Sequence, residues 1–350
     1  MSTAPELPLS VLDLAIVPEG SEPGEALRNS VELARHVERL GYRRHWVAEH
    51  HNMPGIASSA PAVLAAELAA STSTIRVGSG GVMLPNHAPL VVAEQFGTLV
   101  GLHPGRIDLG IGRAPGTDRI TASALRRSPD PLSVEDFPQS LGELLGFFDE
   151  SFYPEGHPYR EITATPGQGM RPEVWLLGSS DYSAQAAGTL GLPFSFAHHF
   201  SPRNTVPAMK VYRESFKPSK WLDEPHGMVA CAVICAPDDD EARYLAGPSR
   251  LSFARLRQGR PGRFPTPEEA ASHKFSVQEE ASVKSVAGSA VIGGPEKVRE
   301  GLNDLAERTG AQELMLTTMV YAQEHRLRSY GLVAEAMAIE PAAAASTRRP

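Results

Sequence analysis

The stretch from Arg43 to Gly116 constrains the fold more than any other part of the chain. Three short apolar runs rich in β-branched and aromatic residues alternate there with two helical patterns. Strand, helix, strand, helix, strand is the order that builds a parallel sheet. Each run ends in polar or glycine-rich residues, at the edge where ligands of such sheets bind. The runs are 44–51, 75–85 and 106–116, and the helical patterns are 60–71 and 90–102.

The same alternation continues along the chain, with helix–glycine–strand junctions at Gly41, Gly191 and Gly310. Eight strands, each paired with a helix, predict an α/β fold, a closed (β/α)8 or TIM barrel formed by residues 1–340 as one domain. The predicted strands are Leu9–Val17, Arg44–His51, Ile75–Pro85, Arg106–Gly116, Glu173–Gly178, Leu192–Phe200, Met228–Ala236 and Glu313–Thr318.

Two stretches, 117–172 and 247–288, do not fit this repeat. The first has one helix candidate, 133–149, among many prolines and glycines, and the second combines five arginines with Pro261, Pro265 and Pro267. Both follow predicted strands, so we expect insertions on the C-terminal face of the barrel, the second as an irregular, mobile lid. Residues 341–350 are expected to form a disordered tail.

Composition excludes several classes of function. A net charge of −8 and a pI near 5.9 disfavour nucleic-acid and membrane-surface partners. No apolar run approaches the ~18 residues of a membrane span, and the first residues lack the plan of a signal peptide. The two cysteines, Cys231 and Cys235, are predicted to be small buried side chains. We therefore expect a cytoplasmic protein.

Two adjacent histidines end each of two predicted strands: His50 with His51, and His198 with His199. Because side chains alternate along a strand, one member of each pair points into the barrel mouth while the strand lasts. Alternation places His50 on the same face as Trp46. Position alone leaves open whether any of these histidines contacts a ligand or is a satisfied structural residue.

Gly80 and Gly81 interrupt a strand that is otherwise rich in valine and methionine. Glycine weakens the interior of a strand, so two glycines at this position call for a structural or functional explanation. Either a flat ligand approaches the backbone closely, or the glycines accommodate packing.

Small residues open the helix after the fifth predicted strand. Free backbone N–H groups at a helix N-terminus bind anions, although an ordinary Ser/Asp N-cap explains the same residues. Arg113, at the end of the preceding strand, is typical of a phosphate or carboxylate partner. Together they predict a phosphate site. The small residues are Gly178, Ser179, Ser180 and Ser183.

Absent residues narrow the chemistry further. The first lysine is Lys210, and no lysine ends a predicted strand, which disfavours a Schiff-base aldolase. The sequence has no His-x-His motif and no cysteine-rich cluster, so we expect no metal. A barrel with a phosphate site and a glycine-floored strand indicates an organic phosphorylated cofactor.

Five segments together carry a resemblance to a known family. In chain order they are WVAEHH (46–51), VGSGGVMLPNHAPL (77–90), GRIDLGIGRAPG (105–116), LLGSSDYSAQAAGTLGLPFSFAHHF (176–200) and VIGGPEKVREGLNDLAERTGAQELML (291–316). From Leu9 to about Met337 the chain resembles the bacterial luciferase-like, flavin-dependent monooxygenase family. The resemblance implies a TIM barrel that binds FMN at its C-terminal face. It also implies that reduced flavin and O2 oxygenate a small organic substrate, that a separate reductase supplies the reduced flavin, and that the protein is a homodimer.

The resemblance also implies roles for individual residues. By motif position, His50 matches the family's catalytic histidine, and Gly80-Gly81 matches a non-prolyl cis peptide beside the flavin ring. Gly112 stands where luciferase has a cysteine, which implies a wider pocket without a thiol. The positions that match the family's phosphate contacts are Arg113, Ser179, Ser180 and Ser183, with Gly178 beside them.

Two alternative functions stay open at this point. The same barrel can carry a dehydrogenase that uses the deazaflavin coenzyme. A flavin-binding or storage protein without turnover is the other alternative. The substrate is set by residues on long loops and cannot be named from the fold.

Overall fold

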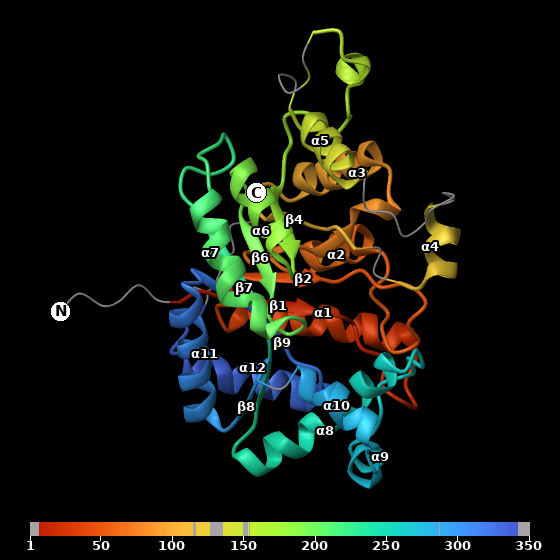
Figure 1. Ribbon diagram of the computed structural model, residues 1–350, viewed down its shortest axis with the longest axis vertical. Coiled ribbons are helices and arrows are strands. Elements are labelled where there is room, and N and C mark those ends of the chain that lie inside the picture. The colour runs from red at the N-terminus through yellow and green to blue at the C-terminus, as the bar shows by residue number, and fades with distance from the viewer. Residues whose placement is uncertain are drawn as a thin grey trace, which may run out of the picture.

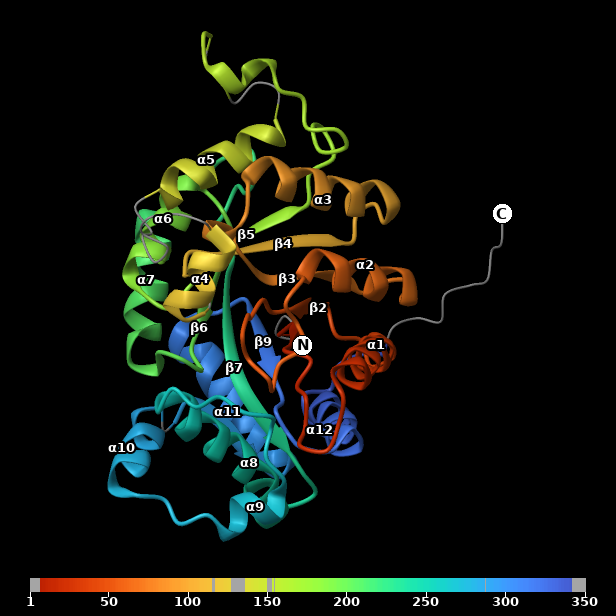
Figure 2. The same ribbon diagram turned by 90° about the vertical axis from the view of Figure 1, so that its right-hand side faces the viewer.

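The computed structural model describes residues 7–114, 117–126, 136–149, 153, 155–286 and 288–341. Its centre is a closed barrel of eight parallel strands, and helices surround the barrel on the outside (Figures 1 and 2). Each of the eight predicted strands overlaps one barrel strand, which confirms the predicted fold class. The barrel strands are β1 (Leu9–Asp13), β2 (Arg44–Val47), β3 (Arg76–Met83), β4 (Ile107–Gly112), β5 (Glu173–Gly178), β6 (Phe194–Ala197), β7 (Gly227–Cys235) and β9 (Glu313–Thr317).

Strand pairing follows the chain around the ring and then closes it. β1 pairs with β2 on one side and with β9 on the other, while β6 pairs with β7. β7 pairs in turn with β9, so no barrel edge is left open. In this ring β2 and β6 stand opposite each other, because three strands separate them in either direction. The C-terminal ends of all eight strands therefore meet at one face.

One further strand, β8 (Ala290–Gly293), was not predicted. It pairs with the C-terminal half of β7, from Ala232 to Cys235, beyond the residues that pair with β6. Four residues are too few to show strand periodicity, and the Gly294-Pro295 start of the next helix follows at once. β8 brings the end of the 247–288 segment back to the barrel.

The helices form because apolar residues recur at helical spacing and face the sheet. In α1, Leu33, Ala34 and Val37 are fully buried, and a proline opens the helix. α6 and α11 end at glycines in the left-handed conformation, as the helix–glycine–strand pattern predicts. The helices are α1 (Pro23–Arg39), α2 (Pro61–Ser71), α3 (Pro89–Leu102), α4 (Arg119–Arg126), α5 (Phe137–Phe147), α6 (Asp181–Leu190), α7 (Thr205–Ser215), α8 (Asp239–Arg257), α9 (Pro267–Ser272), α10 (Val277–Ser285), α11 (Pro295–Thr309) and α12 (Gln323–Ala336), with 3-10 turns η1 (Leu84–Asn86), η2 (Pro158–Glu161) and η3 (Pro202–Asn204).

The apolar core has two main layers. A small cluster that includes Leu12, Trp46 and Trp175 fills the barrel, and a much larger one lies between the strands and the helices. Cys231 and Cys235 belong to the larger layer, where both are buried and unpaired, as predicted. No helix in the part of the chain that the structure describes is long and apolar enough to cross a membrane.

The 117–172 insertion begins at the barrel mouth but does not stay there. α5, which confirms the helix candidate at 133–149, packs against α3 on the outside of the barrel. In both views α5 and η2 lie at the opposite end of the molecule from α8, α9 and α10 (Figures 1 and 2). Residues 127–135, like most of the predicted tail, lie outside the described residues.

The 247–288 segment is not the irregular loop that we expected. α8 continues through Pro248 to Arg257, and α9 and α10 follow. Proline interrupts helical hydrogen bonding, but here the buried face of the helix continues on both sides of it, with Leu245, Leu251 and Ala254. Tertiary packing therefore outweighs the local signal that suggested a loop.

Mobility of 247–288 remains a prediction. Few of its described residues outside α8 are buried, so α9 and α10 should open independently of the strands. Hydrogen exchange followed by mass spectrometry should show α9 and α10 exchanging at least about tenfold faster than β2 and β9. Equal protection of these helices and of the barrel strands in the ligand-free protein would contradict a lid.

Candidate active site

A cavity of about 1240 Å³ opens at the C-terminal ends of the barrel strands. Every barrel strand or the residue just after it contributes to its wall, as do α8, α10 and the turn at 259–264. Active sites of this fold occur at this face. Ligand pockets usually measure roughly 300–1,000 Å³, so this cavity has room for a cofactor and a second molecule.

Gly80 and Gly81 form part of the cavity floor, and the peptide bond between them is cis, as the resemblance implied. A Cβ atom on Gly80 would lie 2.7 Å from Cδ1 of Leu12, and one on Gly81 would lie 2.6 Å from the carbonyl oxygen of Gly110. The contact at Gly81 is with backbone, so packing against protein atoms is enough to require glycine at that position. The backbone also lines the cavity, so the two interpretations left open by the sequence are compatible.

The predicted phosphate-binding residues come together at the ends of β4 and β5. Arg113, Ser179, Ser180 and Ser183 all line the cavity, and the guanidinium of Arg113 lies 4.3 Å from the ring centre of Tyr182 on α6. Gly178 also lines it, and a Cβ there would lie 2.3 Å from Cβ of Ser183, so glycine lets the first turn of α6 approach β5.

This corner of the cavity fits a phosphate monoester. The N-cap residue of α6, Ser180, makes no side-chain hydrogen bond to the helix, so the first backbone N–H groups stay available for an anion. Arg113 adds a cation that can bind phosphate with two hydrogen bonds. Asp181 in the first turn opposes an anion, but its side chain is exposed to solvent, which screens it.

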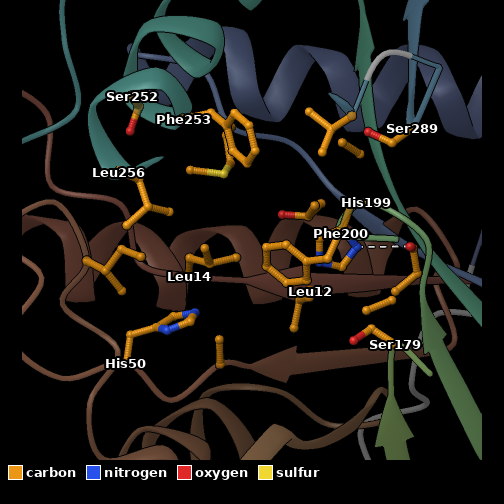
Figure 3. A pocket seen from close by; sticks show the side chains of 18 of the residues that line it. Leu12, Leu14, His50, Ser179, His199, Phe200, Ser252, Phe253, Leu256 and Ser289 are labelled. Atoms are coloured by element: carbon orange, nitrogen blue, oxygen red, sulfur yellow. Dashed lines mark hydrogen bonds between the residues drawn. The ribbon is translucent and has the colours of Figure 1, made fainter. Parts of the chain in front are cut away.

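His50 lies where the parity of β2 predicts. Trp46 and Ala48 face the barrel interior, and His50, two residues further on, points into the cavity (Figure 3). The backbone N–H of His50 donates to the carbonyl of Ser58, which fixes this residue just beyond the end of β2. His50 is half-buried, so a bound ligand would cover the imidazole.

Glu49 points away from the cavity and holds the segment around His50 in place, a role that we did not predict from the sequence. Its carboxylate lies 2.9 Å from Nε2 of both His51 and His87, and it accepts the backbone N–H of Met83. Burial disfavours its charge, but these hydrogen bonds outweigh burial and lower the pKa of Glu49. One buried carboxylate thus connects the segment that follows β2, which contains His50, with the end of β3 and the turn after it. The clue was a carboxylate at the outward-facing position beside the histidines.

The second histidine pair divides into a structural and a cavity-lining member. Nδ1 of His198 bonds the hydroxyl of Thr205, and this side chain is buried away from the cavity. His199 lines the cavity, and its Nδ1 donates to the carbonyl of Ala230 at 2.9 Å (Figure 3). His199, and not His198, is therefore the member that faces a ligand.

The surroundings of His199 determine its protonation state. Burial, together with His198 and His50, lowers the pKa of His199 to about 4, although the carbonyl of Ala230 opposes this. At neutral pH the imidazole is uncharged, and because Nδ1 is the donor, Nε2 carries the lone pair. The cavity thus has a hydrogen-bond acceptor at the end of β6, on the opposite side of the barrel from His50.

Gly112 lines the cavity, but it does not simply enlarge the pocket. A Cβ at this position would lie 2.9 Å from the sulfur of Met83, so the methionine occupies much of the space that a cysteine side chain would take.

Among the described residues, no cluster of three or more His, Cys, Asp or Glu side chains is placed to hold a metal ion.

Comparison of the sequence with known proteins identifies relatives over nearly its full length. The profile of the luciferase-like monooxygenase family matches residues 8–313. The uncharacterised protein YvbT of Bacillus subtilis is 49% identical, covering 93% of this chain and 96% of that protein. A luciferase-like monooxygenase of Escherichia coli is 46% identical (92% and 95%), and the N-acetyl-S-alkylcysteine monooxygenase of B. subtilis is 35% identical (94% and 98%).

Solved structures agree with the sequence comparison. Apo-MsnO8 is 40% identical and superposes with a TM-score of 0.85, covering 96% of this chain and 99% of that one. The oxygenating constituent of 3,6-diketocamphane monooxygenase from Pseudomonas putida, solved with FMN, shares the fold at 19% identity (TM-score 0.70; 94% and 98%). An F420-dependent secondary alcohol dehydrogenase does so at 14% (TM-score 0.66; 95% and 99%). The chain belongs to the luciferase-like monooxygenase family and is a flavin-dependent monooxygenase.

Proposed function

We propose that this enzyme binds FMN at the barrel mouth and uses its reduced form with O2 to oxygenate a small organic substrate. The observation that carries the proposal is the phosphate-binding corner at Arg113 and the N-terminus of α6, on the same cavity as His50. A cofactor whose phosphate binds at β4 and β5 would extend its ring over Gly80-Gly81 at the end of β3, because these strands are neighbours.

Each part of the cavity has a separate task in this proposal. Reduced FMN, when bound, supplies the two electrons that allow one atom of O2 to enter the substrate while the other leaves as water. Arg113 and the α6 N-terminus hold the phosphate, and the backbone at Gly80-Gly81 supports the ring. The imidazole of His50 holds or donates a proton beside the reacting atoms. The 247–288 segment covers the cavity and keeps water out.

The proposal also covers the source of electrons, the oligomeric state and the location of the enzyme. A separate flavin reductase would supply reduced FMN, and the enzyme would act as a homodimer in the cytoplasm. The name of the 35%-identical relative suggests thioethers, and N-acetyl-S-alkylcysteines in particular, as the first substrates to test.

Two experiments separate this function from its alternatives. Titration with FMN, reduced FMN and the deazaflavin coenzyme should show binding of FMN, whereas preference for the deazaflavin would support a dehydrogenase. Mixing the reduced FMN complex with O2 and a panel of N-acetyl-S-alkylcysteines should yield oxygenated product. Release of peroxide alone with every substrate would support a flavin-binding protein without turnover and contradict the monooxygenase proposal for these substrates.

Replacing Arg113 by alanine should weaken FMN binding at least about tenfold. A hydrogen bond to a charged group contributes roughly 1.5–3 kcal/mol, and 1.4 kcal/mol is about tenfold in affinity. Fluorescence titration measures the dissociation constant, with riboflavin, which lacks the phosphate, as a second ligand that should bind equally well to both proteins. Arg119→Ala is the control, because Arg119 is exposed on α4 and does not line the cavity. Unchanged FMN affinity in Arg113→Ala would refute the assignment.

A further inference from the structure

The charges on the cavity wall have the opposite sign to the chain as a whole. The protein has 41 acidic and 33 basic residues, excluding histidine. Among the described residues that line the cavity, the charged ones are Arg113, Arg250, Lys284 and Asp118, three cations and one carboxylate. Asp118 accepts hydrogen bonds from Asn52 and Thr121. Arg113 is accounted for by the cofactor phosphate, so two cations on the opposite wall need another explanation.

Arg250 stands out because of its place on α8. It precedes Phe253 by three residues and Leu256 by six, so the three side chains lie on one face of the helix. All three line the cavity, together with Ala246 on the same face. Ser249 and Ser252 also line the cavity from α8, so Arg250 is the one charged side chain among the residues by which this helix lines the wall.

The neighbouring arginines show what an ordinary partner would be. On the same helix, Arg243 pairs with Asp240, and Arg255 pairs with Glu269. Within the part of the chain that the structure describes, Arg250 forms no ion pair, and its guanidinium lies 5.0 Å from the ring centre of Phe275. Its charge is therefore available to a ligand.

Lys284 contributes less than Arg250. Its ammonium lies 3.4 Å from Glu280 one turn earlier in α10, and its side chain is 75% exposed. Arg250 is exposed as well, but Lys284 also has a carboxylate beside it, which offsets much of its charge. It can strengthen the attraction of an anion toward this wall but does not define where the anion binds.

The space between Arg250 and the barrel floor suits an apolar group. Leu12, Leu14, Phe200 and Leu256 point into the same part of the cavity, with Phe253 above them (Figure 3). Phe200 is 57% exposed even though its ring packs 4.2 Å from that of His199. An exposed aromatic ring inside a cavity marks surface that a ligand would cover.

We propose that the second molecule in this cavity is an organic anion, with its carboxylate or sulfonate on Arg250 and its apolar body among the side chains just described. The proposal deepens the oxygenation of a small organic substrate and rests on it for the role of the bound molecule. Arg250 selects acids over their neutral analogues, while the flavin phosphate binds separately at Arg113.

Calorimetry with 4-phenylbutyrate and its methyl ester tests this preference without any turnover. The two probes share an apolar body and differ in charge. The FMN-loaded wild-type protein should bind the acid about tenfold more tightly than the ester, and the difference should shrink as salt is raised. Arg250→Gln should weaken binding of the acid about tenfold and leave binding of the ester unchanged, whereas Arg250→Lys should retain part of the preference.

Arg257→Gln is the matched control. Arg257 lies on the same helix, is exposed, and does not line the cavity. It should leave the binding of both probes unchanged. Equal binding of acid and ester to the wild type, or equal loss in the Arg250 and Arg257 variants, would overturn the proposal.

The affinity for the cofactor distinguishes this proposal from the one on which it rests. Arg250→Gln should leave the dissociation constant of FMN unchanged, and a loss of tenfold or more would mean that Arg250 serves the cofactor, which overturns the inference. If no flavin binds, the same titrations on the cofactor-free protein still report whether the cavity prefers the acid. Failure of the proposed function therefore appears in the FMN titration, and failure of the anion site appears in the probe titration.

Discussion

Replacing His50 by alanine should slow coupled substrate oxygenation at least about a hundredfold and leave FMN affinity and the melting temperature nearly unchanged. The imidazole is half-buried, points into the cavity and lies just after the end of a barrel strand, where catalytic groups of this fold collect. A positioned acid or base contributes roughly 10²–10⁴-fold in rate. Single-turnover measurements that follow oxygenated product and released peroxide separately will show the loss of coupling.

Rescue separates a chemical role from a structural one. Adding free imidazole to His50→Ala should restore part of the product yield, and the restored rate should follow the fraction of imidazole in one protonation state. His198→Asn is a suitable control, because His198 is buried, bonds Thr205 and does not line the cavity. It should affect stability more than coupling. If His50→Ala lowers the melting temperature while product formation survives, the histidine is structural.

The barrel was predictable because each of its strands is marked twice in the sequence, by an apolar run and by the helix beside it. The parts that were missed lack one of these marks. β8 is only four residues long. α8 contains Pro248, which locally disfavours a helix, and only the packing of residues on both sides of the proline shows that the helix continues.

The site was predictable where a local rule governs the side chain. Alternation along β2 correctly placed Trp46 inside the barrel and His50 at the cavity. The same rule could not decide between His198 and His199, because β6 ends at Ala197 and the chain turns there. The contact of Glu49 with His51 is local, but its contact with His87 was not predictable, because His87 lies 38 residues away in sequence.

The opposite end of the barrel holds a buried charge network that the sequence did not reveal. Arg44, fully buried in β2, lies 2.9 Å from Asp108, 3.1 Å from Glu173 and 2.8 Å from Glu313. Burial disfavours its charge, but these three carboxylates outweigh burial and raise the pKa of Arg44. The four residues come from β2, β4, β5 and β9, so one guanidinium connects strands around the whole ring.

Arg44→Met should therefore lower the free energy of unfolding by about 3–5 kcal/mol, because it removes the buried cation that Asp108 and Glu313 share, although Arg76 still pairs with Asp108. With an unfolding entropy of about 2.1 cal/mol/K per residue, this corresponds to a melting temperature lower by roughly 4–7 °C. Arg43→Met is the control. Arg43 is 47% exposed and lies 3.8 Å from Glu313, so its loss should cost less than about 1 kcal/mol.

The dependence on pH identifies the cause of that loss. Burial opposes the charge of Glu313, but His226, Arg44 and Ser10 outweigh it and lower the pKa of Glu313 from 4.5 to about 2. A carboxylate whose pKa is lower in the folded than in the unfolded protein stabilises the fold at every pH above the unfolded-state pKa. This stabilisation is lost as the pH falls from 4.5 toward 2. Without Arg44 its share of this stabilisation is absent at every pH, while the shares of His226 and Ser10 remain. Urea titrations should thus show a gap between wild type and Arg44→Met that is widest near pH 7 and narrows toward pH 3. A gap that is independent of pH would indicate that lost packing, and not lost charge pairing, destabilises the variant.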